Sequence, residues 1–344
     1  MRTLVFSLLL CVVVIIPTNV LAVSCNFAGY TVVYVNGILT SENKAKDDKK
    51  ALEKKFEQVG RTDIKVLNGY NQSHLAGLGD LIKSVEQAYQ NQDTLADDYD
   101  LNTILLQIHD KVTTQKILLV GHSQGTFYTN ALYKYFVEHG VPGKSIAVYN
   151  LATPASFVAG SGKYVTSSDD KLIESVRKAI ALGSALPPLP ANITIPLTLE
   201  EAAKPYGGHS FSGVYLSGAP NRIVSDISNT LAGLDATAVP DRDGGCFTPP
   251  PQTLVYKAQE VAFAVADPIA TVTTKGVAAT GKSLAAVGNA TVALAKAGYG
   301  AVASAVGLLP NPADVLPPAN RDTAKAAFGV AQALYGSSVS YEDV

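Results

Sequence analysis

Apolar positions in the first half of the chain follow two periods. Short apolar runs with the composition of buried strands lie at 31–35, 64–67, 117–120, 145–151 and 164–165. Helical spacing predicts helices at 45–58, with Leu52 and Phe56 facing inward, and at 101–112. Strands separated by helices predict an α/β fold with a mostly parallel, doubly wound sheet and helices on both faces. Ligand sites in such sheets lie at the carboxyl ends of the strands.

The start of the chain differs in composition from this α/β region, which we place at 26–250. Residues 1–22 combine a positive charge, an apolar core at 4–16 and small residues before a cleavage site. This pattern predicts a signal peptide, and hence a secreted, periplasmic or cell-surface protein. An uncleaved anchor is the alternative. Lipid attachment at Cys25 is a weaker one, because Ala22 fits poorly three places before such a cysteine.

Residues 252–344 are dominated by Ala, Val and Gly, and we expect a helical extension there. Polar positions recur at a heptad spacing that places them on one narrow stripe of a helix, at Lys275, Lys282, Asn289 and Lys296. The remaining, weakly apolar surface needs a cover. Two covers stay open. One is the α/β region or a neighbouring helix, and the other is a membrane surface or partner bound through 252–335.

Charge and motif content argue against several function classes. The formal net charge is −2, from 27 Lys and Arg against 29 Asp and Glu. Without a basic stripe, nucleic acid is not an expected partner. The run Asp241-Arg242-Asp243-Gly244 looks like a fragment of a calcium loop, but it lacks the remaining ligands, so a turn is the simpler interpretation. We expect no metal and no cofactor.

Export bears on two kinds of covalent modification. Of three cysteines, Cys11 leaves with the signal segment, and an even pair in an oxidising compartment predicts a disulfide between Cys25 and Cys246. Two unpaired buried thiols are the alternative. Three Asn-x-Ser/Thr triplets are glycosylation acceptors only in a host that glycosylates, and they begin at Asn71, Asn192 and Asn289.

The apolar run at 117–120 leads directly into Gly121-His122-Ser123-Gln124-Gly125, and a helical pattern follows. A buried strand, a G-x-S-x-G turn and a helix are together typical of a nucleophile elbow, which holds the serine hydroxyl clear of the sheet. Glycines are expected at both flanking positions, because larger residues do not fit in so tight a turn. The alternative is a chance match in a loop, which the flanking strand and helix disfavour. Ser123 is therefore the candidate nucleophile.

A serine nucleophile needs a base, and that base needs an orienting acid. In folds with this elbow, the acid and then the histidine follow the serine along the chain. His209, in a glycine loop, lies well beyond Ser123 and is assigned as the base. Asp169 and Asp170 compete as the acid, and capping the next helix is the other role for either of them. We favour Asp170, because an acid followed after one residue by two aliphatics is the usual arrangement after that strand.

The tetrahedral oxyanion formed by serine attack needs two backbone N–H donors. One is expected from Gln124, next to the nucleophile, and the other from the loop after the first strand. That loop contains Gly37 and Ile38. Ile38 is our first choice as donor and Gly37 the second. An ordinary strand-ending turn is the alternative for both.

With these residues assigned, the chain resembles the α/β-hydrolase superfamily, and within it the lipase and esterase group that carries Gly-His-Ser-Gln-Gly. The resemblance covers about residues 30–230. It rests on the elbow, the Ser–Asp–His order and Val-Asn-Gly-Ile at the oxyanion position. The long stretch 171–208 departs from the family pattern, since its proline-rich run at 186–190 resembles a cap over the site. It also offers a last strand near 193–195.

This resemblance implies an exported serine hydrolase that cleaves carboxylic esters through an acyl-enzyme intermediate. The expected substrate is an acyl ester or lipid. Because the same elbow serves other acyl-transfer reactions, an acyltransferase or thioesterase is the alternative reaction. A hydrolase-fold protein that binds surfaces through its C-terminal helices is the alternative from another class.

Overall fold

The computed structural model describes residues 25–38, 40–72, 99–180, 187–236, 245–252 and 256–257. The predictions for the signal peptide, the turn at 241–244 and the lysine stripe of the C-terminal extension lie outside these ranges. Within them, no helix is long and apolar enough to span a bilayer.

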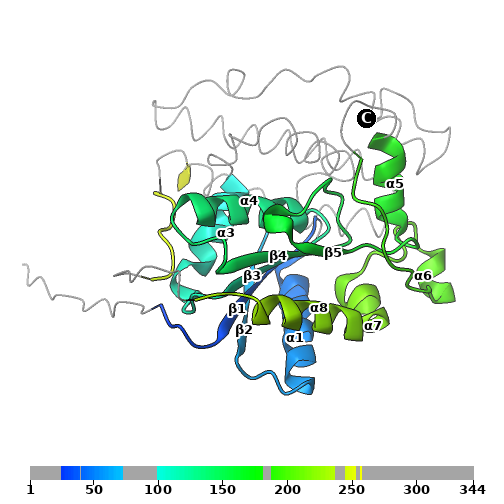
Figure 1. Ribbon diagram of the computed structural model, residues 1–344. Coiled ribbons are helices and arrows are strands. Elements are labelled where there is room, and N and C mark those ends of the chain that lie inside the picture. The colour runs from blue at the N-terminus through cyan, green and yellow to red at the C-terminus, as the bar shows by residue number, and fades with distance from the viewer. Residues whose placement is uncertain are drawn as a thin grey trace, which may run out of the picture.

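The described residues form a five-stranded sheet in which every strand pairing is parallel (Figure 1). Across the sheet the order is β2-β1-β3-β4-β5. The strands are β1 (Tyr30–Val35), β2 (Ile64–Gly69), β3 (Ile117–His122), β4 (Ile146–Leu151) and β5 (Lys163–Val165). Val35 pairs with Gly121, and Leu151 pairs with both His122 and Val165. The carboxyl ends of β1, β3, β4 and β5 therefore lie level along one edge.

Helices cover both faces of the sheet (Figure 1). Four that contribute to the two apolar clusters described next are α1 (Glu42–Gln58), α3 (Tyr99–Ile108), α4 (Gly125–Glu138) and α8 (Pro220–Ala232). In β1, Val32 and Tyr34 join the apolar cluster of α1 and α8, whereas Val33 and Val35 join that of α3 and α4. This alternation confirms the predicted α/β class with a parallel sheet buried on both faces.

The structure moves the ends of the predicted helices. The helix predicted at 45–58 begins at Glu42, because the Ser41 side chain caps it by accepting a hydrogen bond from Lys44 N. The helix predicted at 101–112 is described from Tyr99 and passes after Ile108 into a 3-10 turn, η2 (His109–Lys111). Leu52 and Phe56 are buried, as expected.

Further helices and turns follow β4 along the chain. They are η3 (Ala159–Ser161), α5 (Lys171–Ile180), α6 (Leu199–Ala203), the π-helical turn η4 (Phe211–Tyr215) and α7 (Leu216–Gly218). The strand suggested near 193–195 is not formed, and Ile193 makes only an isolated parallel bridge with Ser167. Backbone bonds between the two segments are few, such as Ser168 N to the Ile193 carbonyl at 2.9 Å, and side chains add to them. Thr166 N donates to Asn192 Oδ1, and Ile195 N donates to Ser167 Oγ.

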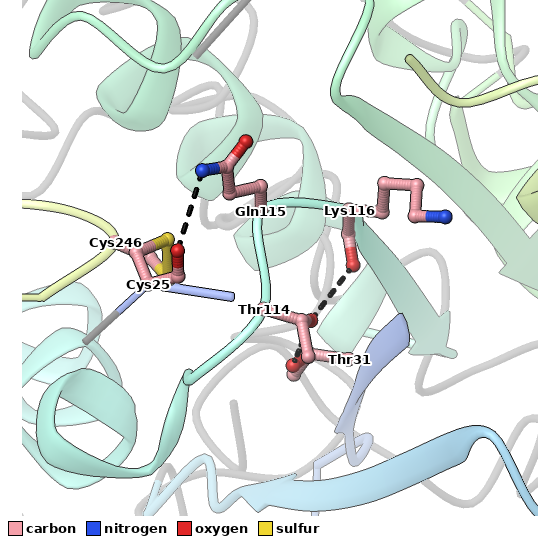
Figure 2. The surroundings of a disulfide bond; sticks show 6 residues. All are labelled: Cys25, Thr31, Thr114, Gln115, Lys116 and Cys246. Atoms are coloured by element: carbon pink, nitrogen blue, oxygen red, sulfur yellow. Dashed lines mark hydrogen bonds between the residues drawn. A yellow bond between two sulfur atoms is a disulfide. The ribbon is translucent and has the colours of Figure 1, made fainter. Parts of the chain in front are cut away.

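Cys25 and Cys246 form a disulfide, as predicted, across a separation of 221 residues (Figure 2). It lies at the amino edge of the sheet, where Gln115 Nε2 donates to the Cys25 carbonyl just before β3 begins. The hydroxyls of Thr31 and Thr114 are hydrogen-bonded nearby, at 2.7 Å. The bond therefore ties segment 245–252 to the entry of β1, at the opposite end of the strands from Ser123.

Candidate active site

Ser123 lies in a sharp turn between β3, which ends at His122, and α4, which begins at Gly125. Its backbone has φ +56°, a left-handed conformation that L-residues adopt at a cost. Three hydrogen bonds stabilise that conformation. Ser123 N donates to the Leu151 carbonyl at 3.0 Å, and the Ser123 carbonyl accepts from both the backbone N and the hydroxyl of Thr126. The turn presents the serine at the amino end of α4, where the helix dipole favours negative charge.

The flanking glycines are required by space. A Cβ atom on Gly121 would lie 2.7 Å from Thr129 Oγ1, and one on Gly125 would lie 2.3 Å from the Val35 carbonyl oxygen. The left-handed backbone belongs to Ser123 and to neither of these glycines. Absence of side chains at 121 and 125 lets α4 approach β1 and β3 closely enough to form the turn.

The hydroxyl of Ser123 is enclosed. The residue is 1% exposed, and its Oγ has no hydrogen-bond partner in the described part of the chain. His209 nevertheless lies beside the same turn. The rings of His122 and His209 are 4.9 Å apart, and His122 Nε2 is 2.8 Å from the His209 carbonyl oxygen. The structure therefore brings His209 next to the residue that precedes Ser123, without a Ser123–His209 hydrogen bond.

His209 is paired with Asp170. Its Nδ1 lies 2.9 Å from Oδ2 and 3.0 Å from Oδ1 of the carboxylate. Asp170 is 1% exposed, whereas the His209 side chain is 14% exposed. A carboxylate on Nδ1 fixes the tautomer with the proton there, which leaves Nε2 as the basic nitrogen.

Two further donors hold the Asp170 carboxylate. Tyr215 donates its hydroxyl to Oδ2 at 2.8 Å, and Ile173 N donates to Oδ1 at 3.1 Å. The second bond makes Asp170 the cap of α5. The sequence suggested that one of Asp169 and Asp170 contacts the histidine while the other caps the helix. In the structure, the Asp170 carboxylate does both.

Asp169 contributes through its backbone. A Cβ atom on Gly208, whose φ is +86°, would lie 2.3 Å from the Asp169 carbonyl oxygen. Lys171 N donates to the Gly207 carbonyl at 3.1 Å. The turn at 169–171 and the segment that carries His209 therefore pack backbone against backbone.

Burial keeps two neighbours of this pair neutral. Desolvation, followed by the nearby charge of His209, holds the pKa of His122 well below its usual range. Since a carbonyl only accepts, the neutral His122 carries its proton on Nε2. Burial, followed by the charge of Asp170, raises the pKa of Tyr215 well above its usual range, so the phenol remains a donor.

The loop expected to supply an oxyanion donor lies against the serine. A Cβ atom on Gly37 would meet Ser123 Cβ at 2.6 Å and Ser123 Oγ at 3.1 Å. Ile38 follows at a half-buried turn position, and Gln124 is 3% exposed at the start of α4. The structure therefore brings Gly37 against the turn that carries Ser123 and Gln124.

The sequence alone assigns no role in the site to Asn71 or Tyr215, and it includes Asn36 only as part of Val-Asn-Gly-Ile. In the sequence, Asn71 is marked only as a glycosylation acceptor. It is 1% exposed and its Nδ2 donates to Gln124 Oε1, so the described fold has no room for a glycan there. One signal was available, because Asn36 and Asn71 closely follow strands, at the edge where sites of parallel sheets lie. Tyr215 lies between Val214 and Leu216 in the sequence, and only the fold shows that its hydroxyl points to Asp170.

Among the described residues, no group of three or more His, Cys, Asp or Glu side chains is arranged to hold a metal ion. Comparisons with protein-family models, curated proteins and solved structures find no match to this chain.

Proposed function

We propose that this chain is a serine hydrolase of the α/β-hydrolase type that cleaves carboxylic esters. One observation carries the proposal. A serine with a left-handed backbone joins a buried strand to a helix, and an Asp170–His209 pair lies beside it at the carboxyl edge of a parallel sheet. The order Ser123, Asp170, His209 along the chain supports the same assignment.

In the proposed reaction, Ser123 Oγ attacks the ester carbonyl carbon while His209 Nε2 takes its proton. Asp170 stabilises the resulting imidazolium, and the amides of Ile38 and Gln124 stabilise the oxyanion. His209 returns the proton to the departing alcohol, and water then releases the acid from the acyl-enzyme. The proposal requires Oγ to come within hydrogen-bond distance of Nε2 when substrate binds, a contact that often tightens only in the complex.

We also propose that the protein acts outside the reducing cytosol. The disulfide between Cys25 and Cys246 supports this, because such bonds persist in oxidising compartments. An acyl ester or lipid is the substrate class that we propose, following the resemblance to lipases and esterases.

Replacement of the nucleophile tests the proposal. Ser123→Ala should lower kcat for ester hydrolysis by about 10⁴-fold or more, because without the hydroxyl no acyl-enzyme forms. A fluorophosphonate should label wild-type protein at Ser123, since only an activated serine reacts quickly. Hydrolysis of an ester panel and mass spectrometry of the labelled peptide are the measurements.

Ser161→Ala is the matched control. Ser161 also has a left-handed backbone, with φ +55°, but it is exposed at the end of η3. This variant should keep wild-type activity and labelling. Undiminished hydrolysis by Ser123→Ala, or labelling that survives in it, would end the proposal.

A further inference from the structure

Three buried side-chain amides meet beside the proposed oxyanion site. They belong to Asn36, Asn71 and Gln124, which are 0%, 1% and 3% exposed. Asn36 follows β1, Asn71 follows β2, and Gln124 directly precedes α4, so three separate segments converge here. Buried amides cost stability unless they are hydrogen-bonded, so such a cluster needs specific partners.

Asn36 and Asn71 are joined by reciprocal bonds. Asn36 Nδ2 donates to the Asn71 carbonyl at 3.0 Å, and Asn71 N donates to Asn36 Oδ1 at 2.9 Å. The Asn71 side chain reaches back, with Nδ2 at 3.4 Å from the Asn36 carbonyl oxygen. These bonds tie the chain leaving β1 to the chain leaving β2.

The same amides fix the peptide that carries one proposed donor. Asn36 Nδ2 also donates to the Gly37 carbonyl oxygen, at 3.0 Å. In a trans peptide the carbonyl and the following N–H point in opposite directions. Holding the Gly37 carbonyl therefore fixes the direction of the Ile38 N–H, and the contact between Gly37 and Ser123 fixes how near that peptide lies to the nucleophile.

Asn71 also contacts Gln124, the residue that carries the second proposed donor. Asn71 Nδ2 donates to Gln124 Oε1 at 3.0 Å, which anchors the side chain of the residue whose N–H follows Ser123. Asn71 thus contacts both segments from which the oxyanion donors are proposed to come. An asparagine is suited to this task, because its backbone N–H and side-chain NH2 donate while its backbone carbonyl accepts.

We propose that Asn71 is a positioning residue that holds the N–H groups of Ile38 and Gln124 in register with Ser123. This inference rests on the proposed function, because it concerns the oxyanion of that reaction. Asn71 acts through Asn36 and Gln124 and touches no reacting atom.

Asn71→Ala tests the inference, because it should change kcat and KM to different extents. Loss of register should weaken binding of the transition state more than that of the ester. We expect kcat to fall about 10- to 100-fold and affinity for a trifluoromethyl ketone, which forms an oxyanion on Ser123, to fall by a similar factor. KM should change less than about threefold. Activities are normalised to the fraction of protein that a fluorophosphonate labels at Ser123.

Asn130→Ala is the matched control. Asn130 is also a buried asparagine with two bonds to backbone, to Phe157 O and from Ala159 N, but these hold the loop after β4. This variant should keep kcat and ketone affinity per labelled site. Gln124→Met removes the acceptor of Asn71 without altering the backbone. The double variant with Asn71→Ala should lose no more ketone affinity than Asn71→Ala alone.

Each outcome is decisive. Unchanged kcat and ketone affinity in Asn71→Ala, or equal losses in Asn130→Ala, overturn the inference and leave the proposed hydrolase intact. If Asn71→Ala does not fold, Gln124→Met takes its place. A loss of kcat and ketone affinity in Gln124→Met then supports the inference, and unchanged values overturn it. A wild-type protein that neither hydrolyses esters nor is labelled at Ser123 overturns the proposed function and this inference with it.

Discussion

At the scale of single residues, the Asp170–His209 pair is held by neighbours that remain uncharged. Tyr215 donates to the carboxylate, and its hydroxyl in turn accepts from Ser167 N at 3.0 Å. His122 holds the other end of the pair through the His209 carbonyl. Because burial shifts the pKa of both groups in the direction of the neutral form, neither introduces a charge that competes with Asp170 for the histidine.

Burial of His122 should make stability depend on pH. In the unfolded chain its pKa is about 6.5, and in the folded protein the pKa is well below that value. Above pH 6.5 both states are neutral. Below it the unfolded chain takes up a proton that the folded protein does not, so the free energy of unfolding falls as pH falls. His122→Gln places a non-titrating donor near the Nε2 position and should abolish this component.

Denaturant unfolding of wild type and His122→Gln at pH 8, 6.5 and 5.5 measures the effect. Relative to the variant, wild type should lose about 1 kcal/mol between pH 6.5 and 5.5. Parallel curves for the two proteins would show that His122 titrates alike in both states.

At the scale of elements, the sequence predicted the strands well and the loops that join them poorly. Apolar runs such as 117–120 are diagnostic, because a strand of a doubly covered sheet is buried on both faces. The roles of Asn36, Asn71 and Tyr215 depend on which segments become neighbours in space. No local period contains that information, so the amide cluster and the support of Asp170 become visible only in the fold.

The glycines before His209 illustrate the same point. The sequence places His209 in a glycine loop. In the structure, Gly208 combines a left-handed backbone with a close approach to the Asp169 carbonyl. Position 208 must lack a side chain because the Asp169 carbonyl occupies that space.

Gly208→Ala should therefore separate His209 from Asp170. The added Cβ collides with the Asp169 carbonyl, and displacement of a reacting group by about 1 Å costs about 100-fold in rate. Kinetics per folded molecule and thermal unfolding are the measurements.

Gly60→Ala is the control for this variant. Gly60 has φ +76°, and nothing lies within 4 Å of a Cβ added there. It should lose about 1 kcal/mol of stability from backbone strain and no activity. Equal kcat values for the two variants would contradict the role given to Gly208.

At the scale of the molecule, the covalent link and the candidate site occupy opposite edges of the sheet. The disulfide joins the entry of β1 to segment 245–252, where Phe247 packs against Phe136 of α4 at a ring distance of 4.5 Å. The site lies where β1 and β3 end. Stability and chemistry should therefore respond separately to loss of the link.

The double variant Cys25→Ser and Cys246→Ser tests this separation. Closing a loop with 221 residues of separation restricts the unfolded chain, an effect worth up to about 5 kcal/mol. The free energy of unfolding should fall by an amount of this order, while kcat at a temperature where the variant stays folded should remain unchanged. A lowered kcat with an unaltered free energy of unfolding would contradict this separation, because the disulfide would then support the site and not the fold.

Synthesis delivers Cys25 long before Cys246, and this order limits how the bond seen in Figure 2 can arise. Apart from this pair, the full sequence contains one cysteine, Cys11, in the segment expected to be removed. Until translation has passed residue 246, a processed chain has only thiols of other molecules as partners for Cys25. Rapid oxidation of nascent protein therefore favours covalent dimers and mixed disulfides, whereas later oxidation favours the linked monomer. In a preparation of linked monomers, Cys25 was therefore available as a thiol after synthesis had passed residue 246.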